Sequence, residues 1–233
     1  MAKKNIFEGF APKIIDFFAD LEQNNKKEWF DENRPFYEKD IRDTGKSLIS
    51  DMALIFANEG LPYVADPKKS LFRINRDIRF SNNKEPYKTN LGMFFPYSLN
   101  QASTKKSSAV GLYFHIDHTQ IFIAGGVPGV DPEKLKLIRE KIAEDYDELN
   151  ELSAIPEIKK YFPKVIELST PLKTVPRGYD KDHPAADWLK KKDYGYYGEI
   201  EQSEIFSAEL KETLLHRAKI MVPFLEYFRT AVE

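Results

Sequence analysis

The sequence predicts an α+β fold in which a central, mainly antiparallel sheet, built as a meander, is flanked by N-terminal and C-terminal helices. Apolar residues recur at a helical spacing near both ends of the chain. In the middle the period changes from about 3.6 to 2, as a half-buried strand requires. No linker rich in Pro, Gly or Ser interrupts the 233 residues, so we expect a single domain over 1–233.

The first third of the chain is expected to be helical. Pro12 suits a first helical position, and the apolar stripe from Ile14 to Leu21 ends near Asn24. A longer helix is predicted beyond Pro35, and Gly60 ends it.

Strands are predicted next, beginning with the alternating segment 72–80. Within it Arg76 lies on the apolar face, where a guanidinium needs a partner, and Asp77 is the expected one. Further strands are predicted at 90–97, 109–116 and 120–127, and shorter ones at 165–168 and 194–200.

The second half should supply the remaining helices. Asp131 and Pro132 form a helix start whose apolar stripe extends to Leu149, and a short helix follows to residue 161. Residues 174–184 are expected to form a loop and 185–191 a short helix. The last helix should be capped near Ser207 and kinked at Pro223.

Composition restricts the classes of function. The chain has no cysteine, which excludes disulfides and thiolate chemistry, and it has neither a secretory apolar region nor a membrane-spanning stretch. We therefore expect a soluble cytoplasmic protein without a membrane partner. A formal net charge of −2 argues against nucleic acid as a partner.

Charge is nevertheless segregated along the chain. Residues 68–90 carry seven basic and two acidic side chains, whereas residues 131–157 carry four basic and nine acidic ones. Arg73 and Arg79 share one face of the predicted strand about 20 Å apart at ~3.3 Å per residue, which suits an extended anionic ligand. Tyr87 offers a stacking surface for such a ligand. Lys84 and Lys88 lie at a turn that could fold over the strand face. The alternative is a solvated strand edge protected by charge.

A second segment, 175–184, is a Pro- and Gly-fixed loop that presents Arg177, Tyr179 and His183. A rigid structural turn is the alternative interpretation. If this loop packs beside the basic segment, the two would form a basic and aromatic pocket for phosphate or carboxylate groups. The predicted ligand-binding residues are Arg73, Arg76, Asp77, Arg79, Lys84, Tyr87, Lys88, Arg177 and His183.

The run from His115 to His118 contains residue types that bind Zn²⁺ or Fe²⁺. On a strand, however, His115 and Asp117 share a face while His118 points elsewhere, so we predict no metal site and no cofactor. No familiar catalytic motif is present, which leaves open whether the protein is an enzyme. If it is, His183 and His115 are the candidate acid–base residues, because imidazole titrates near neutral pH.

The motif over residues 72–81 with Lys84 and Pro86-Tyr87-Lys88, and the later Pro176-Arg177-Gly178-Tyr179 with His183-Pro184, resembles domain of unknown function 2461 over nearly the whole chain. Gly125-Gly126 and the helix after Asp131 follow in the same order. Asn83 departs from the family pattern, which often has an acidic residue there. The resemblance implies no activity.

Three functions remain in competition. The leading hypothesis is binding, with or without turnover, of an anionic, phosphorylated small molecule. The second is a nucleic-acid-binding module that uses Tyr87 and Phe80 as stacking surfaces. The third is a protein-interaction or structural role through the charged segments, with the protein partner unassigned.

Overall fold

The computed structural model describes residues 6–79, 81–99 and 110–232. Helix α1 (Lys13–Gln23) is followed by a nearly continuous helical stretch made of α2 (Lys27–Phe36), a π-helical segment (Tyr37–Asp43) and α3 (Thr44–Asn58). The predicted long helix therefore begins before Pro35, which lies inside α2. The π-helical segment begins two residues after this proline, which removes one backbone donor.

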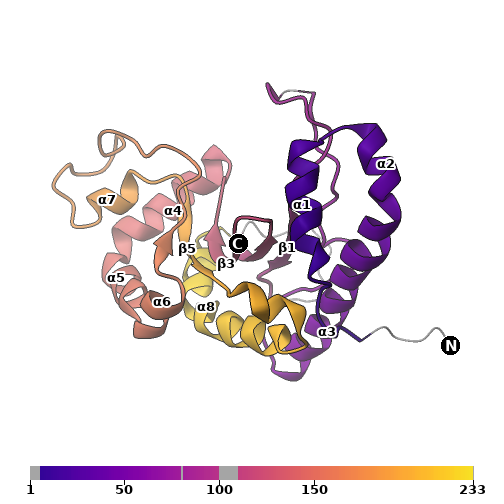
Figure 1. The fold of residues 1–233 in the computed structure, drawn as a ribbon. Coiled ribbons are helices and arrows are strands. Elements are labelled where there is room, and N and C mark those ends of the chain that lie inside the picture. The colour runs from indigo at the N-terminus through magenta and orange to yellow at the C-terminus, as the bar shows by residue number, and fades with distance from the viewer. Residues whose placement is uncertain (1–5, 80, 100–109, 233) are drawn as a thin grey trace.

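The sheet is antiparallel and has the strand order β1-β2-β3-β5-β4. Strands β1 (Leu91–Pro96), β2 (Gly111–Ile116) and β3 (Ile121–Val127) form the predicted meander. Strand β5 (Tyr194–Glu199) pairs with β3, and the two-residue β4 (Lys164–Val165) lies at the outer edge. An α+β fold with helices at both ends of the chain is thereby confirmed (Figure 1).

Between β3 and β5 the chain forms α4 (Pro132–Glu144), α5 (Tyr146–Ala154), α6 (Pro156–Tyr161) and α7 (Ala186–Leu189). The predicted helix from residue 131 to 149 is broken at Asp145. The Tyr227 hydroxyl lies 3.3 Å from the Lys141 carbonyl and 3.2 Å from the Asp145 carbonyl, so it can donate to groups that a helix end leaves unpaired. After β5 come a 3₁₀ helix (Gln202–Phe206) and α8 (Leu210–Val232), which contains Pro223.

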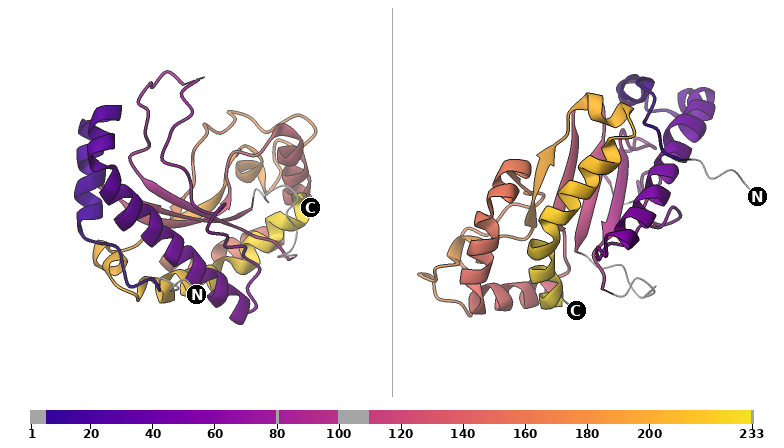
Figure 2. Two further views of the ribbon diagram at one scale, coloured as in Figure 1. Left: turned by 90° about the vertical axis from the view of Figure 1, so that its right-hand side faces the viewer. Right: turned by 90° about the horizontal axis from the view of Figure 1, so that it is seen from below.

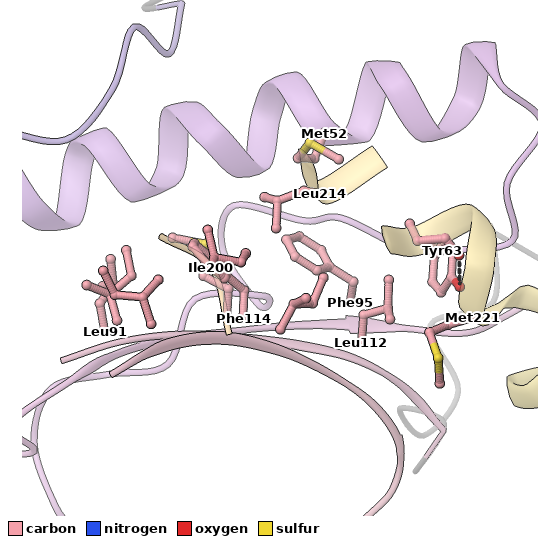
Figure 3. Close-up of a cluster of buried hydrophobic side chains, with 14 of the residues drawn as sticks. Met52, Tyr63, Leu91, Phe95, Leu112, Phe114, Ile200, Leu214 and Met221 are labelled. Carbon is pink, nitrogen blue, oxygen red and sulfur yellow. Dashed lines mark hydrogen bonds between the residues drawn. The ribbon is translucent and has the colours of Figure 1, made fainter. Parts of the chain in front are cut away.

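One face of the sheet carries the core. Helices α3 and α8 lie on this face, and loops rise from the opposite face (Figure 2). Figure 3 shows apolar side chains filling the space between the helices and strands, which curve away from the helices at both ends. Fully burying each such Leu or Phe contributes roughly 1.5–3 kcal/mol. The labelled members are Met52, Tyr63, Leu91, Phe95, Leu112, Phe114, Ile200, Leu214 and Met221.

The prediction of a strand at 72–80 is wrong. Residues 71–78 run beside the β1 edge and make isolated bridges, Leu71 with Met93 and Asn75 with Tyr87, instead of a ladder. The opposing arm contains Pro86, which has no amide hydrogen to extend a ladder. The alternation reflects a one-sided burial in which Ile74 faces the core. Phe80 lies outside the described residues, and β4 is shorter than the predicted strand 165–168.

None of the helices in the described ranges combines the length and apolar character that crossing a membrane requires.

Candidate functional site on the concave face of the sheet

The face of the sheet opposite the core carries aromatic side chains where polar ones are usual for a solvated face. Cross-strand pairing places Phe94 opposite Tyr113, and Ala124 between Tyr113 and Tyr197. Phe122 lies 5.3 Å from the Tyr197 ring and 6.0 Å from the Tyr113 ring, centroid to centroid. The strands curve toward this side, so the aromatic face is concave (Figure 3).

Small residues make this face hollow. Glycine or alanine occupies the inward positions between the rings, at Gly92, Gly111, Ala124 and Gly126. A Cβ atom on Gly111 would lie 2.7 Å from Cζ of Phe94, and one on Gly92 would lie 2.7 Å from the Tyr113 hydroxyl. The Phe94 and Tyr113 side chains therefore pack directly against the backbone of these glycines.

The resulting hollow has a volume of about 460 Å³, within the range of small-molecule sites. One wall is the stretch that follows β4, where Leu168 is 75% exposed. The lining residues are Phe94, Gly111, Tyr113, Gln120, Phe122, Ala124, Gly126, Pro128, Val165, Ile166, Glu167, Leu168 and Tyr197.

A hydrogen-bonded polar group lies at one end of the aromatic face. The Nε2 atom of His115 is 2.7 Å from Oδ2 of Asp117, and its Nδ1 atom is 3.0 Å from the Tyr113 hydroxyl. Asn90 Nδ2 is 3.3 Å from the same hydroxyl. The imidazole stacks on Phe122, with 4.6 Å between centroids and 15° between planes. This contact fixes the imidazole plane.

The environment moves two pKa values in this group. Burial of the Asp117 carboxyl opposes ionisation, but hydrogen bonds from His115, from Thr119 and from the Gln120 amide outweigh it and lower its pKa. Burial raises the pKa of Tyr113 to about 12. At neutral pH the carboxylate is therefore ionised and the phenol protonated.

A cationic cluster, which we define as Arg73, Arg76 and Lys88, adjoins this polar group. A hollow of about 360 Å³ is lined by Arg76, Lys88, Asn90, Thr89 and Asp77, whose carboxylate is held by Arg79. Burial, and then the charges of the two arginines, lower the pKa of Lys88. Its ammonium lies 5.2 Å from the ring centroid of Phe72, and that centroid is 5.8 Å from the centroid of Tyr113. Asn90 and Phe72 thus connect the cluster to the aromatic face.

The other predicted residues of the basic segment bind one another or the core. Arg79 is held by Asp77 through bonds of 2.9 and 2.7 Å, and Lys84 donates to the Ile78 carbonyl at 3.0 Å. Arg76 is half-buried, as expected, but its ion-pair partner is Glu85 at 3.3 Å, not Asp77. The Tyr87 ring is 5% exposed and stacks on Phe30, with 4.1 Å between centroids.

The second predicted segment lies at the other end of the sheet. Arg177 and Tyr179 line a separate hollow of about 400 Å³ against Arg139 and Glu140 of α4. His183 accepts a hydrogen bond from the Ala185 amide at 3.0 Å, at the start of α7. The basic segment borders β1 whereas this loop adjoins β5 (Figures 1 and 2). Among the described residues, Arg177 lines one hollow and Arg76 and Lys88 line another.

A buried carboxylate helps to hold this second region in place. Asp193, 3% exposed, accepts the Ser169 amide at 2.7 Å and the Gly129 amide at 3.0 Å. It joins the chain before α4 to the loop that leads toward Arg177. Through Asp193, which directly precedes β5, the loop is therefore bound both to the sheet and to the segment before α4.

Sequence reasoning missed the aromatic face. Tyr113 alternates with buried Leu112 and Phe114, and Phe122 with Ile121 and Ile123, which places an aromatic ring where a solvated strand would carry a polar residue. An aromatic residue at these alternating positions was the signal in the sequence that could have indicated the aromatic face. In the same run His118 turns away from His115 and pairs with Glu22 at 3.3 Å.

Comparison with known proteins gave one match. A family model described as conserved hypothetical protein (DUF2461) matches residues 13–227 of the chain. Searches of curated proteins and of solved structures gave no significant match.

Proposed function

The chain belongs to the family of conserved hypothetical proteins DUF2461, and from the geometry of its concave site we propose that it binds a phosphorylated small molecule that carries a planar ring. The observation that carries this proposal is the position of Asn90. It lines the cationic hollow and also donates to Tyr113 on the aromatic face. One ligand could therefore contact both regions.

The cationic cluster supports the anionic part of the ligand. Lys88 lies close enough to Arg73 and Arg76 for their charges to lower its pKa. A phosphate placed among the three would relieve this repulsion and accept charge-assisted hydrogen bonds. Arg79 and Lys84 of the same segment do not line the cationic hollow and contact Asp77 and the Ile78 carbonyl, so we assign them a supporting role.

The aromatic hollow supports the ring. Its volume of about 460 Å³ suits one or two fused rings, and the rings around it offer offset or edge contacts. The stretch 165–168 closes one side, which favours a compact ligand over a long polymer. The cytoplasmic location inferred from composition remains part of this proposal.

The row of aromatic rings on an open sheet face also favours the second candidate, a single-stranded nucleic acid, because bases stack on such platforms. The formal charge of −2 opposes it. A polymer would bind more tightly than a mononucleotide and with a steeper salt dependence.

The test is isothermal titration with AMP, adenosine, ribose 5-phosphate and an eight-nucleotide RNA. We expect AMP or another mononucleotide to bind more tightly than either of its parts. The double variant Arg73→Gln/Lys88→Gln should lose the gain in affinity that the phosphate provides. Lys69→Gln, which removes one charge at an exposed side chain outside the lining of the cationic hollow, should keep it. No binding by any mononucleotide or sugar phosphate would refute the proposal, and preference for RNA would transfer it to the second candidate.

A further inference from the structure

The contacts of Asp117 determine where the hydrogens of the polar group lie. The carboxylate accepts the Thr119 amide at 2.6 Å, the Thr119 hydroxyl at 2.8 Å and the Gln120 amide at 2.7 Å, all through Oδ1. Its Oδ2 atom faces Nε2 of His115. An ionised carboxylate has no hydrogen to give, so Nε2 must be the donor.

This donation restricts the remaining bonds. A neutral imidazole carries one N–H, so Nδ1 of His115 is an acceptor when Nε2 donates. The Tyr113 hydroxyl, 3.0 Å away, can then donate to Nδ1, while the Asn90 amide, 3.3 Å from both Nδ1 and the phenolic oxygen, can donate to either. Tyr113 lines the aromatic hollow, and its hydroxyl contacts Asn90, which lines the cationic hollow, so its hydrogen can be directed at a base beside the proposed phosphate position.

We propose that Asp117, His115 and Tyr113 form a proton relay that makes the Tyr113 hydroxyl a nucleophile toward the phosphoryl group of the bound ligand. The oxygen attacks phosphorus, an O–P bond forms, the bond to the leaving alkoxide breaks, and the phenolic proton passes to Nδ1 of His115. The imidazolium then protonates the leaving group, and Asp117 stabilises its charge. This inference rests on the proposed ligand class only for the identity of the electrophile.

Among the described residues, the titratable groups next to His115 are the other two members of the proposed relay. Tyr113 and Asp117 are the titratable groups bonded to the ring. Asn90 and Gly92 on the β1 side and Phe122 on β3 are uncharged. Farther along the same face, Glu199 pairs with Lys164, and the cationic cluster lies beyond Asn90.

Benzenesulfonyl fluoride tests the relay without knowledge of the substrate. Its sulfur accepts the phenolic oxygen, fluoride leaves, and the proton goes to the base, so the chemistry mirrors the proposed step. We expect peptide mass mapping to locate the label on Tyr113 in preference to Tyr197. Tyr197 lines the same hollow, but in the described part of the chain its hydroxyl contacts no imidazole.

The pH profile separates a relay from a structural network. With the relay, a base other than hydroxide removes the phenolic proton, so the labelling rate levels off well below the pH at which the phenol ionises; without it, the rate keeps rising toward the phenol pKa of about 12. His115→Gln should slow labelling of Tyr113 by about 100-fold, the lower range for general-base catalysis. Asp117→Asn should slow it less, with Tyr197 labelling as the internal reference in every variant.

The outcomes are distinguishable from those of the proposed function. Labelling of Tyr113 with a plateau below the phenol pKa, protected by a mononucleotide, supports both proposals. Labelling with a plateau but no nucleotide binding supports the relay and refutes the ligand. Absence of preferential labelling in the wild type, or a rate that climbs without a plateau, overturns the relay whether or not nucleotides bind.

Discussion

The hydroxyl of Tyr63 should stabilise α8 close to Pro223. Pro223 lacks an amide hydrogen, and its ring interferes with the turn that precedes it. The Tyr63 hydroxyl donates to the Ala218 carbonyl in that turn at 2.8 Å, and the bond is buried. Because burial raises the pKa of Tyr63 well above its usual value, the hydroxyl remains a donor over the whole accessible pH range.

Tyr63→Phe removes this donor and little else, because the ring and its edge-to-face contact with Tyr97, 5.5 Å between centroids, are retained. The Ala218 carbonyl keeps its helical donor, the Val222 amide, so only the net contribution of one hydrogen bond is lost, about 0.5–1.5 kcal/mol. We expect the variant to lose about that much unfolding free energy, or roughly 1–6 °C in Tm for a chain of this size.

Urea unfolding followed by fluorescence and circular dichroism would measure the loss. Tyr37→Phe is the matched control, since Tyr37 is also buried but its hydroxyl has no hydrogen-bond partner among the described residues. If Tyr63→Phe is no less stable than Tyr37→Phe, the hydroxyl is not stabilising α8 and the reasoning is wrong.

Three further predictions concern the loop and the site. Asp193→Ala should lose about 2–3 kcal/mol in urea unfolding, because the Ser169 and Gly129 amides lose the buried carboxylate that accepts their hydrogen bonds, whereas Asp187→Ala, with a side chain 92% exposed, should change little; equal losses would contradict this. Gly92→Ala should weaken mononucleotide binding in calorimetry by displacing the Tyr113 hydroxyl, and unchanged affinity would exclude that displacement. Lys88→Met should weaken binding without destabilising the fold, since its lowered pKa means that folding disfavours the charged amine; this penalty applies below the folded pKa and disappears as pH rises through the unfolded value. A less stable Lys88→Met would show that the ammonium is net favourable.

Local patterns predicted the elements whose periodicity and end signals agree. Strands β1, β2, β3 and β5 lie within a few residues of the expected ranges, and helices α1 and α8 follow their apolar stripes. The segment 72–80 misled because alternation reports one-sided burial, and a chain running beside a sheet edge can have that burial without a ladder.

The candidate site was harder to predict, because it depends on which strands become neighbours. The sequence placed Arg73, Lys88 and His115 among the candidates, but the separation of the two basic segments follows from the insertion of β5 beside β3. Membership in the DUF2461 family, by contrast, was correctly predicted from short motifs. Motifs identify ancestry without specifying which side chains meet.

The small residues under the aromatic rings differ in how freely they could vary among relatives. A methyl group on Gly126 would collide with the backbone of β5 at Tyr194, so that position is constrained by strand pairing. Ala124 already carries a Cβ and lies between Tyr113 and Tyr197. Exchange of Ala124 for valine or leucine would fill the bottom of the hollow from a position that already accepts a side chain, so this residue sets how much of the volume stays open in this chain.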